Sequence, residues 1–303
     1  MHLAPSNPIT RATVNPLPFY VGAFLLLWSF AFVAGKIGVT YCPPLILLSA
    51  RFLLAGLLTF AVMTGRRERW QLSLRDAGAF AIVGLANNAL FLGLGYTGLQ
   101  SVSAGLGGLI VSANPVLTAI LAAAFLGERL TGRKVAGLIL GVAGVAIIVT
   151  HRLSIGTDSL RGTLFTLASL ASIVAGTLLF RLLAPRGDLW LGNGIQNLAA
   201  GVVLAPVALL FSSVGDIVPN VRLLTAFAFL VLGGSMLGFL FWFRLLKVWG
   251  ATAASSFHFL IPPLSILFAW LVLGERVVAV DLLGILPVAL GIYLVTRPPG
   301  SPA

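Results

Sequence analysis

Charged residues are scarce in this sequence. They make up 9% of its 303 residues, whereas hydrophobic residues make up 59%. Soluble domains carry about 25% charged residues, so the composition excludes an ordinary soluble protein. Cysteine is scarcer still, because Cys42 stands alone. This excludes an intrachain disulfide and says nothing about the redox compartment.

Acidic residues are absent from the middle of every long apolar stretch. All eight lie in loops or at the ends of those stretches: Glu68, Asp76, Glu128, Asp158, Asp188, Asp216, Glu275 and Asp281. An acid–base or metal site inside a membrane would need clustered His, Asp or Glu side chains. The sequence also lacks the G-x-x-x-x-G-K-[ST] motif that holds ATP phosphates. We therefore expect no catalytic residue, no metal and no cofactor.

Long apolar stretches fill almost the whole chain. About 20 mostly apolar residues cross a bilayer core, and ten stretches meet this requirement: 17–39, 43–64, 77–98, 102–126, 133–150, 162–183, 189–211, 222–246, 252–273 and 279–296. The sequence thus predicts an all-α integral membrane protein with ten transmembrane helices. Residues 1–16 and 297–303 have no apolar core, and we expect a disordered cytoplasmic tail and a short cytoplasmic tail there.

Basic residues gather on one side of the predicted membrane. If the N-terminus is cytoplasmic, thirteen face the cytoplasm: Arg11, Arg66, Arg67, Arg69, Arg75, Arg129, Arg133, Lys134, Arg181, Arg186, Arg244, Lys247 and Arg297. Five face the other side: Lys36, Arg152, Arg161, Arg222 and Arg276. Cytoplasmic loops carry an excess of Lys and Arg, so we expect both termini in the cytoplasm. Topology therefore explains the net charge of +11, and no nucleic-acid partner is expected.

The chain repeats one pattern at an offset of 147 residues. Pro115 recurs as Pro262, and the corner 127–129, Gly-Glu-Arg, recurs at 274–276. Internal similarity at a fixed offset indicates a structural repeat. Ten helices divide into five and five, at 17–150 and 160–296, and an odd number makes the second copy enter the membrane from the opposite side. The sequence thus predicts two inverted five-helix repeats, a recurring plan of secondary transporters.

Several longer motifs occur in order in both repeats. They are W-S-F-A-F-V-A-G-K at 28–36, P-P-L-I-L-L-S-A-R-F at 43–52, L-G-Y-T-G-L-Q-S-V-S-A-G at 94–105, N-P-V-L-T at 114–118 with L-G-E-R at 126–129, and I-P-P-L-S at 261–265 with L-G-E-R at 273–276. In these motifs the chain resembles the ten-helix, EamA-like members of the drug/metabolite transporter superfamily. The resemblance implies a bacterial inner-membrane exporter of small metabolites such as amino acids, and it leaves the substrate open.

Polar and aromatic residues recur at helical spacing within the predicted helices. Ser255, His258, Pro262 and Ser265, for example, are spaced by three, four and three residues and share one helix face. We interpret such faces as the lining of a substrate cavity, made by Trp28, Asn87, Asn88, Phe91, Ser112, Ser172, Ser235, Phe239, Trp242, Ser255 and His258. The alternative is that small residues let helices approach and that Ser or Asn bonds across the interface.

Four further residues each allow two or more roles. Pro115 and Pro262, at equivalent depths, are candidate gating hinges or simple packing residues. His258 could carry a proton, contact the substrate or be structural, because imidazole changes charge near neutral pH. Arg51 lies about 12 Å inside the second predicted helix at 1.5 Å per residue. A charge there needs a partner, which is either a set of polar groups near the outer end of the bundle or a ligand.

The leading hypothesis is an alternating-access secondary transporter that exports small polar or amphipathic metabolites. The alternative is an intramembrane enzyme acting on lipid or isoprenoid phosphates, and a channel is a third class without a filter-like loop to support it. We expect a small-molecule substrate and the lipid bilayer as partners, and either a monomer or a homodimer. Proton coupling is left open.

Overall fold

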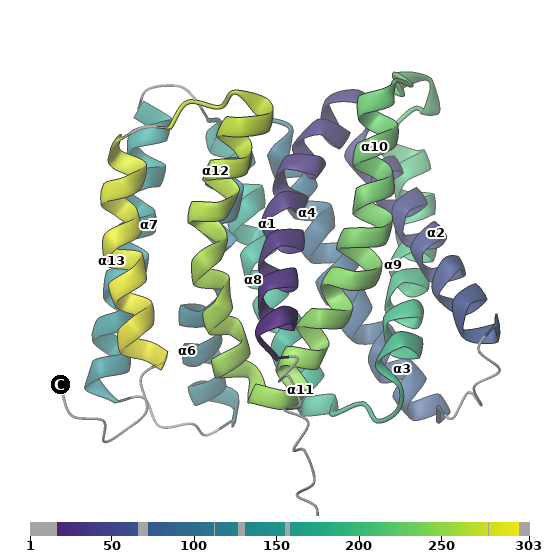
Figure 1. Ribbon diagram of the computed structural model, residues 1–303, viewed down its shortest axis with the longest axis horizontal. Helices are drawn as coiled ribbons and strands as arrows, with labels where there is room; N and C mark the ends of the chain where they lie inside the picture. Colours follow the sequence, from purple (N-terminus) through teal and green to yellow (C-terminus); the bar gives the residue numbers. More distant parts are fainter. Residues whose placement is uncertain are drawn as a thin grey trace, which may run out of the picture.

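The fold is a bundle of helices, shown by a computed structural model that describes residues 17–65, 72–111, 113–126, 131–154, 158–277 and 279–296 (Figure 1). The two predicted tails, 1–16 and 297–303, lie outside the described residues. So does the Gly-Glu-Arg corner at 127–129. Within the described residues there is no β-strand. The helices form ten spans, some of which consist of two or three consecutive helices.

The first half contains five spans. They are α1 (Leu17–Tyr41); α2 (Pro44–Gly65); α3 (Leu74–Gly84) with the π-helix η1 (Leu85–Leu90) and α4 (Phe91–Leu99); α5 (Ala104–Val111) with α6 (Asn114–Leu126); and α7 (Gly132–Ser154). The third and fourth spans are therefore each built from more than one helix.

The second half repeats this arrangement. Its spans are α8 (Leu160–Leu183); α9 (Leu189–Phe211); α10 (Val221–Phe229) with the π-helix η3 (Leu230–Gly238) and α11 (Phe239–Ser256); the 3-10 turn η4 (Phe257–Leu260) with α12 (Ile261–Leu273); and α13 (Ala279–Thr296). A short 3-10 turn, η2 (Val214–Asp216), lies between α9 and α10.

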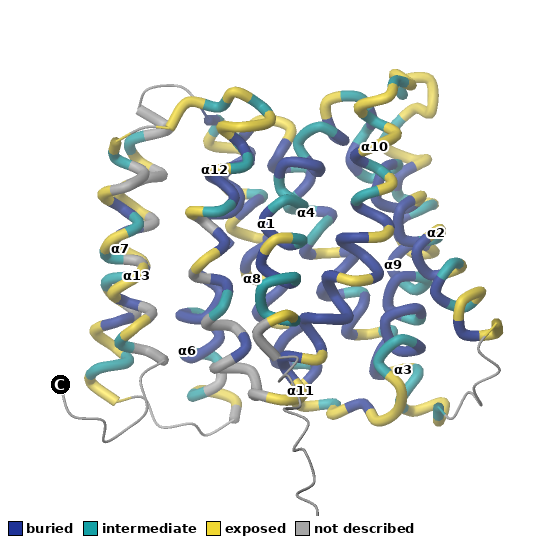
Figure 2. Tube along the Cα trace, in the orientation of Figure 1, coloured by how far each residue is buried: buried dark blue, intermediate teal, exposed yellow. Residues whose placement is uncertain are grey.

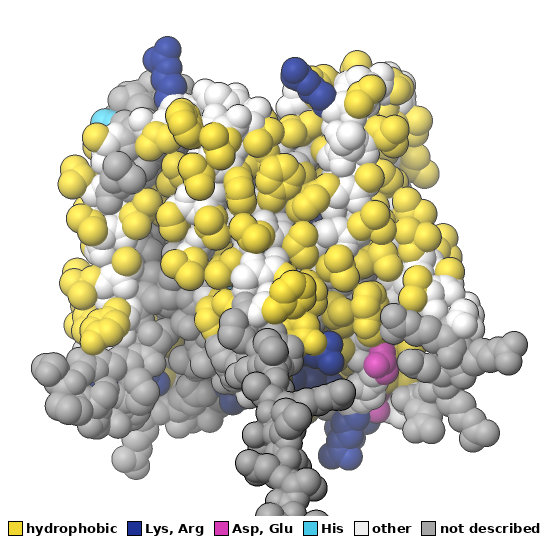
Figure 3. Space-filling model, in the orientation of Figure 1, with side chains coloured by type: hydrophobic (Ala, Val, Ile, Leu, Met, Phe, Trp, Pro, Cys, Tyr) yellow, Lys and Arg dark blue, Asp and Glu magenta, His cyan; other side chains and the backbone are white. Residues whose placement is uncertain are grey.

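Seven of these ten spans, searched over the described residues, are by length and composition able to cross a membrane; the first of them is Phe19–Tyr41. Their outward side chains suit lipid, because large apolar residues such as Leu57, Phe125, Leu210 and Trp270 are more than half exposed. Figure 3 shows a belt of hydrophobic side chains on the face in view, with charged side chains at its two ends. Burial is deepest in the central helices (Figure 2).

Equivalent helices of the two halves pack against one another. The second span packs on the seventh (α2 on α9) and the fifth on the tenth (α7 on α13). The third span packs on the sixth (α4 on α8), and the equivalent pair, the eighth and the first, also packs (η3 on α1). This pairing is what a pseudo-two-fold axis between the halves requires.

The two halves are inverted. The Glu275 carboxylate, just after α12, accepts hydrogen bonds from the backbone N–H groups of Ala104 (2.9 Å) and Gly105 (3.2 Å) at the start of α5. The end of the ninth span therefore meets the beginning of the fourth, so α12 and α5–α6 run in opposite directions (Figure 1). The predicted fold class, ten helices in two inverted five-helix repeats, is confirmed.

The boundary between the eighth and ninth spans differs from the prediction. A helix was expected at 252–273, but α11 continues to Ser256 and η4 then turns the chain before α12 begins at Ile261. His258 thus lies in a 3-10 turn, and Ser255 belongs to the preceding helix. The reason is the Pro262–Pro263 pair: proline is accepted in the first turn of a helix but not in its interior.

Glycines on the fifth span serve packing within the chain. A Cβ atom added to Gly291 of α13 would collide with the carbonyl oxygen of Gly137 and lie 2.8 Å from the nitrogen of Gly141, both on α7. The close approach of these two helices therefore needs glycine at position 291.

Candidate functional site

A cavity lies between helices of both halves. Its walls come from α1, α2, α4 and α5 of the first half and from α8, η3 and α11 of the second. The cavity volume is about 50 Å³, and the wider space between its lining atoms, about 590 Å³, includes open solvent. The lining residues are mostly apolar: Leu27, Trp28, Ala31, Phe32, Arg51, Phe91, Leu92, Gly95, Tyr96, Leu99, Gly107, Val111, Thr166, Ser169, Gly234, Gly238 and Phe239.

Arg51 is the one basic residue in this lining. Its side chain is only 2% exposed. Its Nε donates a hydrogen bond to the Ser235 hydroxyl (2.7 Å), and its Nη1 donates to the Tyr96 hydroxyl (2.8 Å). The guanidinium carbon also lies 5.4 Å from the ring centre of Phe52 and 5.8 Å from that of Tyr96. Two neutral hydroxyls and two aromatic rings therefore stabilise the positive charge of the guanidinium group.

Close helix packing positions Tyr96. A Cβ atom on Gly35 of α1 would lie 2.9 Å from the Tyr96 ring, so only glycine lets α1 pass this ring. Gly95, next to Tyr96, faces Ser169 of α8, and a Cβ atom added to it would lie 3.4 Å from the hydroxyl, an ordinary contact. Small residues on α1 and α4 thus bring a phenol and a hydroxyl to the cavity wall.

The two π-helices occupy equivalent positions in the two halves. Adding 147 to the limits of η1 gives 232–237, which lies inside η3. Asn88 and Ser235, equivalent under the same offset, both lie in these wide turns and are both fully buried. A π-helical turn inserted in an α-helix is often found at functional sites, and here it interrupts two of the spans that border the cavity.

An amide network satisfies the backbone of η3. Asn193 of α9 donates hydrogen bonds to the carbonyl oxygens of Ser235 (2.9 Å) and Met236 (3.2 Å). Asn197, one turn along α9, donates to the Ser235 carbonyl (3.4 Å) and accepts from the Asn88 amide (3.3 Å). Carbonyls in a membrane interior need such partners, so this network holds Ser235 in place beside Arg51.

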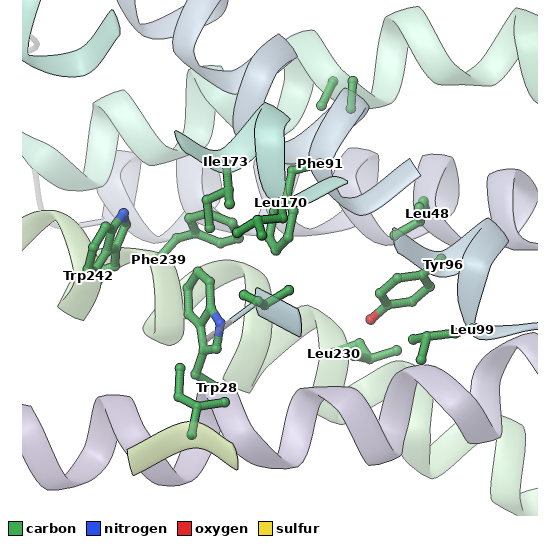
Figure 4. Close-up of a cluster of buried hydrophobic side chains, with 14 of the residues drawn as sticks. Trp28, Leu48, Phe91, Tyr96, Leu99, Leu170, Ile173, Leu230, Phe239 and Trp242 are labelled. Carbon is green, nitrogen blue, oxygen red and sulfur yellow. The ribbon is translucent and has the colours of Figure 1, made fainter. Parts of the chain in front are cut away.

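An aromatic cluster lies at one end of the cavity. Trp28 and Phe239 line the cavity with ring centres 5.1 Å apart. Trp28 continues into a buried group with Phe24 (5.1 Å) and Trp242 (6.2 Å). Figure 4 shows Trp28, Phe91 and Phe239 together in one part of the core, and Tyr96 and Leu99 in another.

His258 belongs to this aromatic cluster. It is fully buried, and its ring centre lies 4.7 Å from Trp242, 5.4 Å from Phe24 and 5.6 Å from Trp28. It therefore contacts a cavity-lining residue, Trp28, without lining the cavity itself.

A charged group surrounds the turn from 99 to 105 beside the other end of the cavity. The Lys36 ammonium donates to the carbonyl oxygens of Leu99 (2.6 Å) and Val102 (2.7 Å). Asp158 accepts from the backbone N–H of Ser103, and Glu275 caps the start of α5. Both carboxylates lie close enough to interact with the ammonium. We call Lys36, Asp158 and Glu275 the Lys36 cluster, and it ties the first, sixth and ninth spans to this turn.

The predicted substrate residues fall into three groups. Trp28, Phe91 and Phe239 line the cavity. Ser235 reaches it through its hydrogen bond to Arg51. Asn87, Asn88, Ser172, Trp242 and His258 do not line it. Asn87 lies against Gly176 of α8, where a Cβ atom would collide with its amide. Asn88 joins the amide network, and Ser172 donates to the Ala168 carbonyl (3.0 Å).

The remaining predicted residues lie at helix starts or outside the described residues. Ser112 and the side chains of Ser255 and Pro262 are among the latter. Pro115 is buried in the first turn of α6, just after the break between α5 and α6. The repeat places Pro262 equivalently, and α12 carries proline in its first turn. Each proline therefore begins a helix where its span is interrupted.

The sequence prediction did not include Arg51 and Tyr96 among the substrate residues. For Arg51 the sequence left two alternatives, pairing with polar groups near the outer end of the bundle or binding of a ligand. The S-A-R-F motif placed a charge in an apolar helix, and this signal was sufficient to include it. Tyr96 gave no comparable signal beyond its place in L-G-Y-T-G. Within the described residues no three His, Cys, Asp or Glu side chains gather as metal ligands would.

Comparison with known proteins agrees with this architecture. Residues 18–150 and 160–297 each match the model of the EamA-like transporter family. The chain is 33% identical over 285 residues to the uncharacterized transporter YvbV of Bacillus subtilis, covering 90% of this chain and 89% of that protein. It is 29% identical to an uncharacterized transporter of Archaeoglobus fulgidus, covering 89% of this chain and 95% of that one.

Two further comparisons extend this result. A protein of Escherichia coli named "Probable amino-acid metabolite efflux pump" is 24% identical, with 89% of this chain and 91% of that protein covered. A crystal structure with 19% sequence identity superposes with a TM-score of 0.69 over 93% of this chain and 98% of that one, which shows the shared fold. With the family model matching both halves, the chain is a multi-pass membrane transporter that belongs to the EamA-like transporter family.

Proposed function

We propose that this transporter exports small amphipathic metabolites, amino acids first among them, by alternating access. The observation that carries the proposal is the cavity shared by both repeats, which combines aromatic walls with the buried Arg51 and the hydroxyls of Tyr96 and Ser169. Inverted repeats commonly hold their substrate near the midplane between the halves.

The two ends of the cavity support an alternating mechanism. One end is lined by packed aromatic rings, and the other adjoins the Lys36 cluster at the turn from 99 to 105. Transport requires each end to open while the other stays closed, and the two are built from different interactions. The contacts of Glu275 with the start of α5 join the ninth span to the fourth, so their loss would free this end.

Amino acids are the first candidate substrates because of the name of a related protein. The Escherichia coli protein named as an amino-acid metabolite efflux pump is similar over 89% of this chain. The excess of basic residues on the side of both termini supports the orientation argued from sequence, with the termini in the cytoplasm. The inner membrane is proposed from the family resemblance.

Counterflow in proteoliposomes tests the proposal. Vesicles that contain the purified protein are loaded with one unlabelled amino acid at a time and diluted into the labelled form. We expect accelerated uptake of the labelled form for at least one amino acid, with the molecule recovered chemically unchanged. A chemically altered molecule would instead indicate the enzyme alternative, and no acceleration for any amino acid would refute the amino-acid assignment.

Pro115 and Pro262 are the proposed hinges. Each begins a helix at an interruption of its span, and such interruptions can absorb the dihedral changes of a hinge. Pro262→Ala should slow exchange without reducing the amount of protein inserted in the membrane. Unchanged exchange kinetics would contradict the hinge.

His258 is the proposed site of proton coupling or of indirect substrate contact through Trp28. Its pH-sensitive ring is buried among three aromatic side chains. The comparison of wild type and His258→Gln over pH 5 to 9 tests both roles. Normal exchange by the variant at every pH would exclude both.

A further inference from the structure

We propose that Arg51 is the substrate anchor of the cavity and that the transported molecule carries a carboxylate beside an apolar or aromatic part. This inference rests on the proposed transport function and narrows its substrate class. It follows from the charge balance of the cavity, from the hydrogen bonds that Arg51 makes, and from the space beside its guanidinium group.

The charge of Arg51 has no acidic partner in the described part of the chain. The acidic residues with described side chains all lie at helix ends or in loops: Asp76, Asp158, Asp188, Asp216 and Glu275. Ser235 and Tyr96 are the only hydrogen-bond partners of the guanidinium there, and both hydroxyls are neutral. A buried charge inside a membrane protein normally pairs with an opposite charge or marks a substrate pathway.

The guanidinium has donors to spare. Arginine carries five N–H groups in a planar fork, and the hydrogen bonds to Ser235 and Tyr96 use one on Nε and one on Nη1. The edge formed by Nη1 and Nη2 has the geometry that binds a carboxylate with two parallel hydrogen bonds. Ser235 and Tyr96 thus fix the orientation of the fork, and neither of them accepts a hydrogen bond from Nη2.

Glycine is the residue that fits beside this edge. A Cβ atom on Gly234 would lie 2.6 Å from Nη2 of Arg51, so any larger residue would displace the guanidinium. Gly234 belongs to η3, whose wide turn is held by Asn193 and Asn197, and both Gly234 and Arg51 line the cavity. The π-helix therefore presents a bare backbone next to the donor nitrogen.

The single positive charge favours a carboxylate over a phosphate. A phosphate monoester carries about −1.5 to −2 charges at neutral pH, and Arg51 is the one basic residue in the described cavity lining. A carboxylate balances it with one charge. The aromatic residues Trp28, Phe91 and Phe239 then suit the apolar part of the substrate, and their ring faces can also accept the ammonium group of an amino acid.

Matched ligands with one side chain test the anchor. Binding of 3-phenylpropionate, L-phenylalanine, 2-phenylethylamine and phenyl phosphate to the purified full chain is measured by calorimetry, with the same compounds in counterflow. We expect the two carboxylates to bind and the amine not to bind. Binding of the amine alone, of none of the four, or of the phosphate more tightly than the acid overturns the proposal.

Two variants locate the site. Arg51→Met should lower the affinity for 3-phenylpropionate by about tenfold to a hundredfold, the range for hydrogen bonds to charged groups. Gly234→Ala should have a similar effect because it crowds Nη2 while the charge stays, so it serves if Arg51→Met does not fold. Gly22→Ala is the matched control, since nothing lies within 4 Å of its added Cβ atom.

The outcomes separate the two proposals. If Arg51→Met and Gly234→Ala keep the wild-type preference for the acid, the anchor is wrong. If the wild type exchanges neutral or cationic compounds but no carboxylate, the proposal of transport is kept and the proposal that Arg51 anchors a carboxylate is refuted. If no amino acid or test compound is exchanged, the amino-acid transport proposal fails independently of where the carboxylates bind.

Discussion

Replacing Asn193 by leucine removes the amide that serves the π-helical turn of the eighth span. The wild-type amide donates to the carbonyl oxygens of Ser235 (2.9 Å) and Met236 (3.2 Å), and its oxygen accepts from Asn197 (3.2 Å). Hydrogen bonds inside membrane proteins average about 0.6 kcal/mol each, with a maximum near 1.7. The loss of three should lower the free energy of unfolding by about 2 kcal/mol.

For Gln196, on the same helix, we expect the opposite effect on the free energy of unfolding. Its side chain is as deeply buried as that of Asn193, but neither of its amide atoms has a hydrogen-bond partner within the described residues. A buried amide without a partner costs stability, and its replacement by an apolar group of similar shape is nearly neutral or stabilising. Gln196→Met should therefore leave the free energy of unfolding unchanged or raise it.

Unfolding in mixed micelles with increasing SDS measures both variants against wild type. Asn193→Leu should unfold at a lower SDS fraction, whereas Gln196→Met should unfold at the same or a higher one. If Gln196→Met is destabilised as much as Asn193→Leu, removal of a buried amide at this depth lowers stability whether or not the amide is hydrogen-bonded. The reasoning from individual hydrogen bonds would then be refuted.

Three further predictions concern other parts of the bundle. Glu275→Gln should weaken the cap of α5 by about 0.3–1 kcal/mol and speed maleimide labelling of a cysteine placed at Leu99; unchanged labelling would contradict a gate at this end. Burial raises the pKa of the Cys42 thiol to about 11, so the folded protein should label about a hundredfold more slowly at pH 8 than the unfolded one, because the thiolate reacts. The labelling rate should rise as the pH approaches 11, and equal rates at pH 8 would exclude the shift. Gly291→Leu should destabilise the α7–α13 contact by about 1–3 kcal/mol through overpacking, measured by SDS unfolding, whereas the open site Gly132→Leu should not.

The sequence was sufficient to predict the spans and their duplication. The offset of 147 residues came from Pro115 and the Gly-Glu-Arg corner, and it correctly paired Asn88 with Ser235, which both lie in π-helical turns. These predictions succeeded because bilayer thickness fixes the length of a span, and because an odd number of spans per repeat fixes the inversion.

The rotation of each helix was harder to predict. In a soluble helix the polar face marks solvent, but here most faces are apolar and lipid resembles the protein interior. Gly84, Gly108 and Gly176 lie against Gln196, Ser265 and Asn87 on neighbouring spans, so Asn87, which was expected to line the cavity, packs between helices. Sequence spacing identified the faces that are small or polar, and only packing decides whether such a face meets another helix or the cavity.

The same limit explains why Arg51 was not placed in the site. Its position in the second span showed that a charge is buried, but Ser235 lies 184 residues away and Tyr96 lies 45 residues away. No local pattern indicates that these hydroxyls converge on one guanidinium. Their meeting depends on Gly35 and Gly234, which leave room for the Tyr96 ring and for Nη2.

Duplication has kept the backbone of the two halves while the site has become asymmetric. The equivalents of Arg51 and Tyr96 in the second repeat are Leu198 and Phe243, 147 residues on, and both are apolar. The equivalent of Asn193 in the first repeat is Ile46, so the amide support exists on one side alone. In the proposed alternating-access mechanism, the symmetry between the halves would exchange the open end of the cavity without moving its charge to the other half. A carboxylate held by Arg51 would keep the same partner in both conformations, and its apolar part would meet the changing aromatic wall.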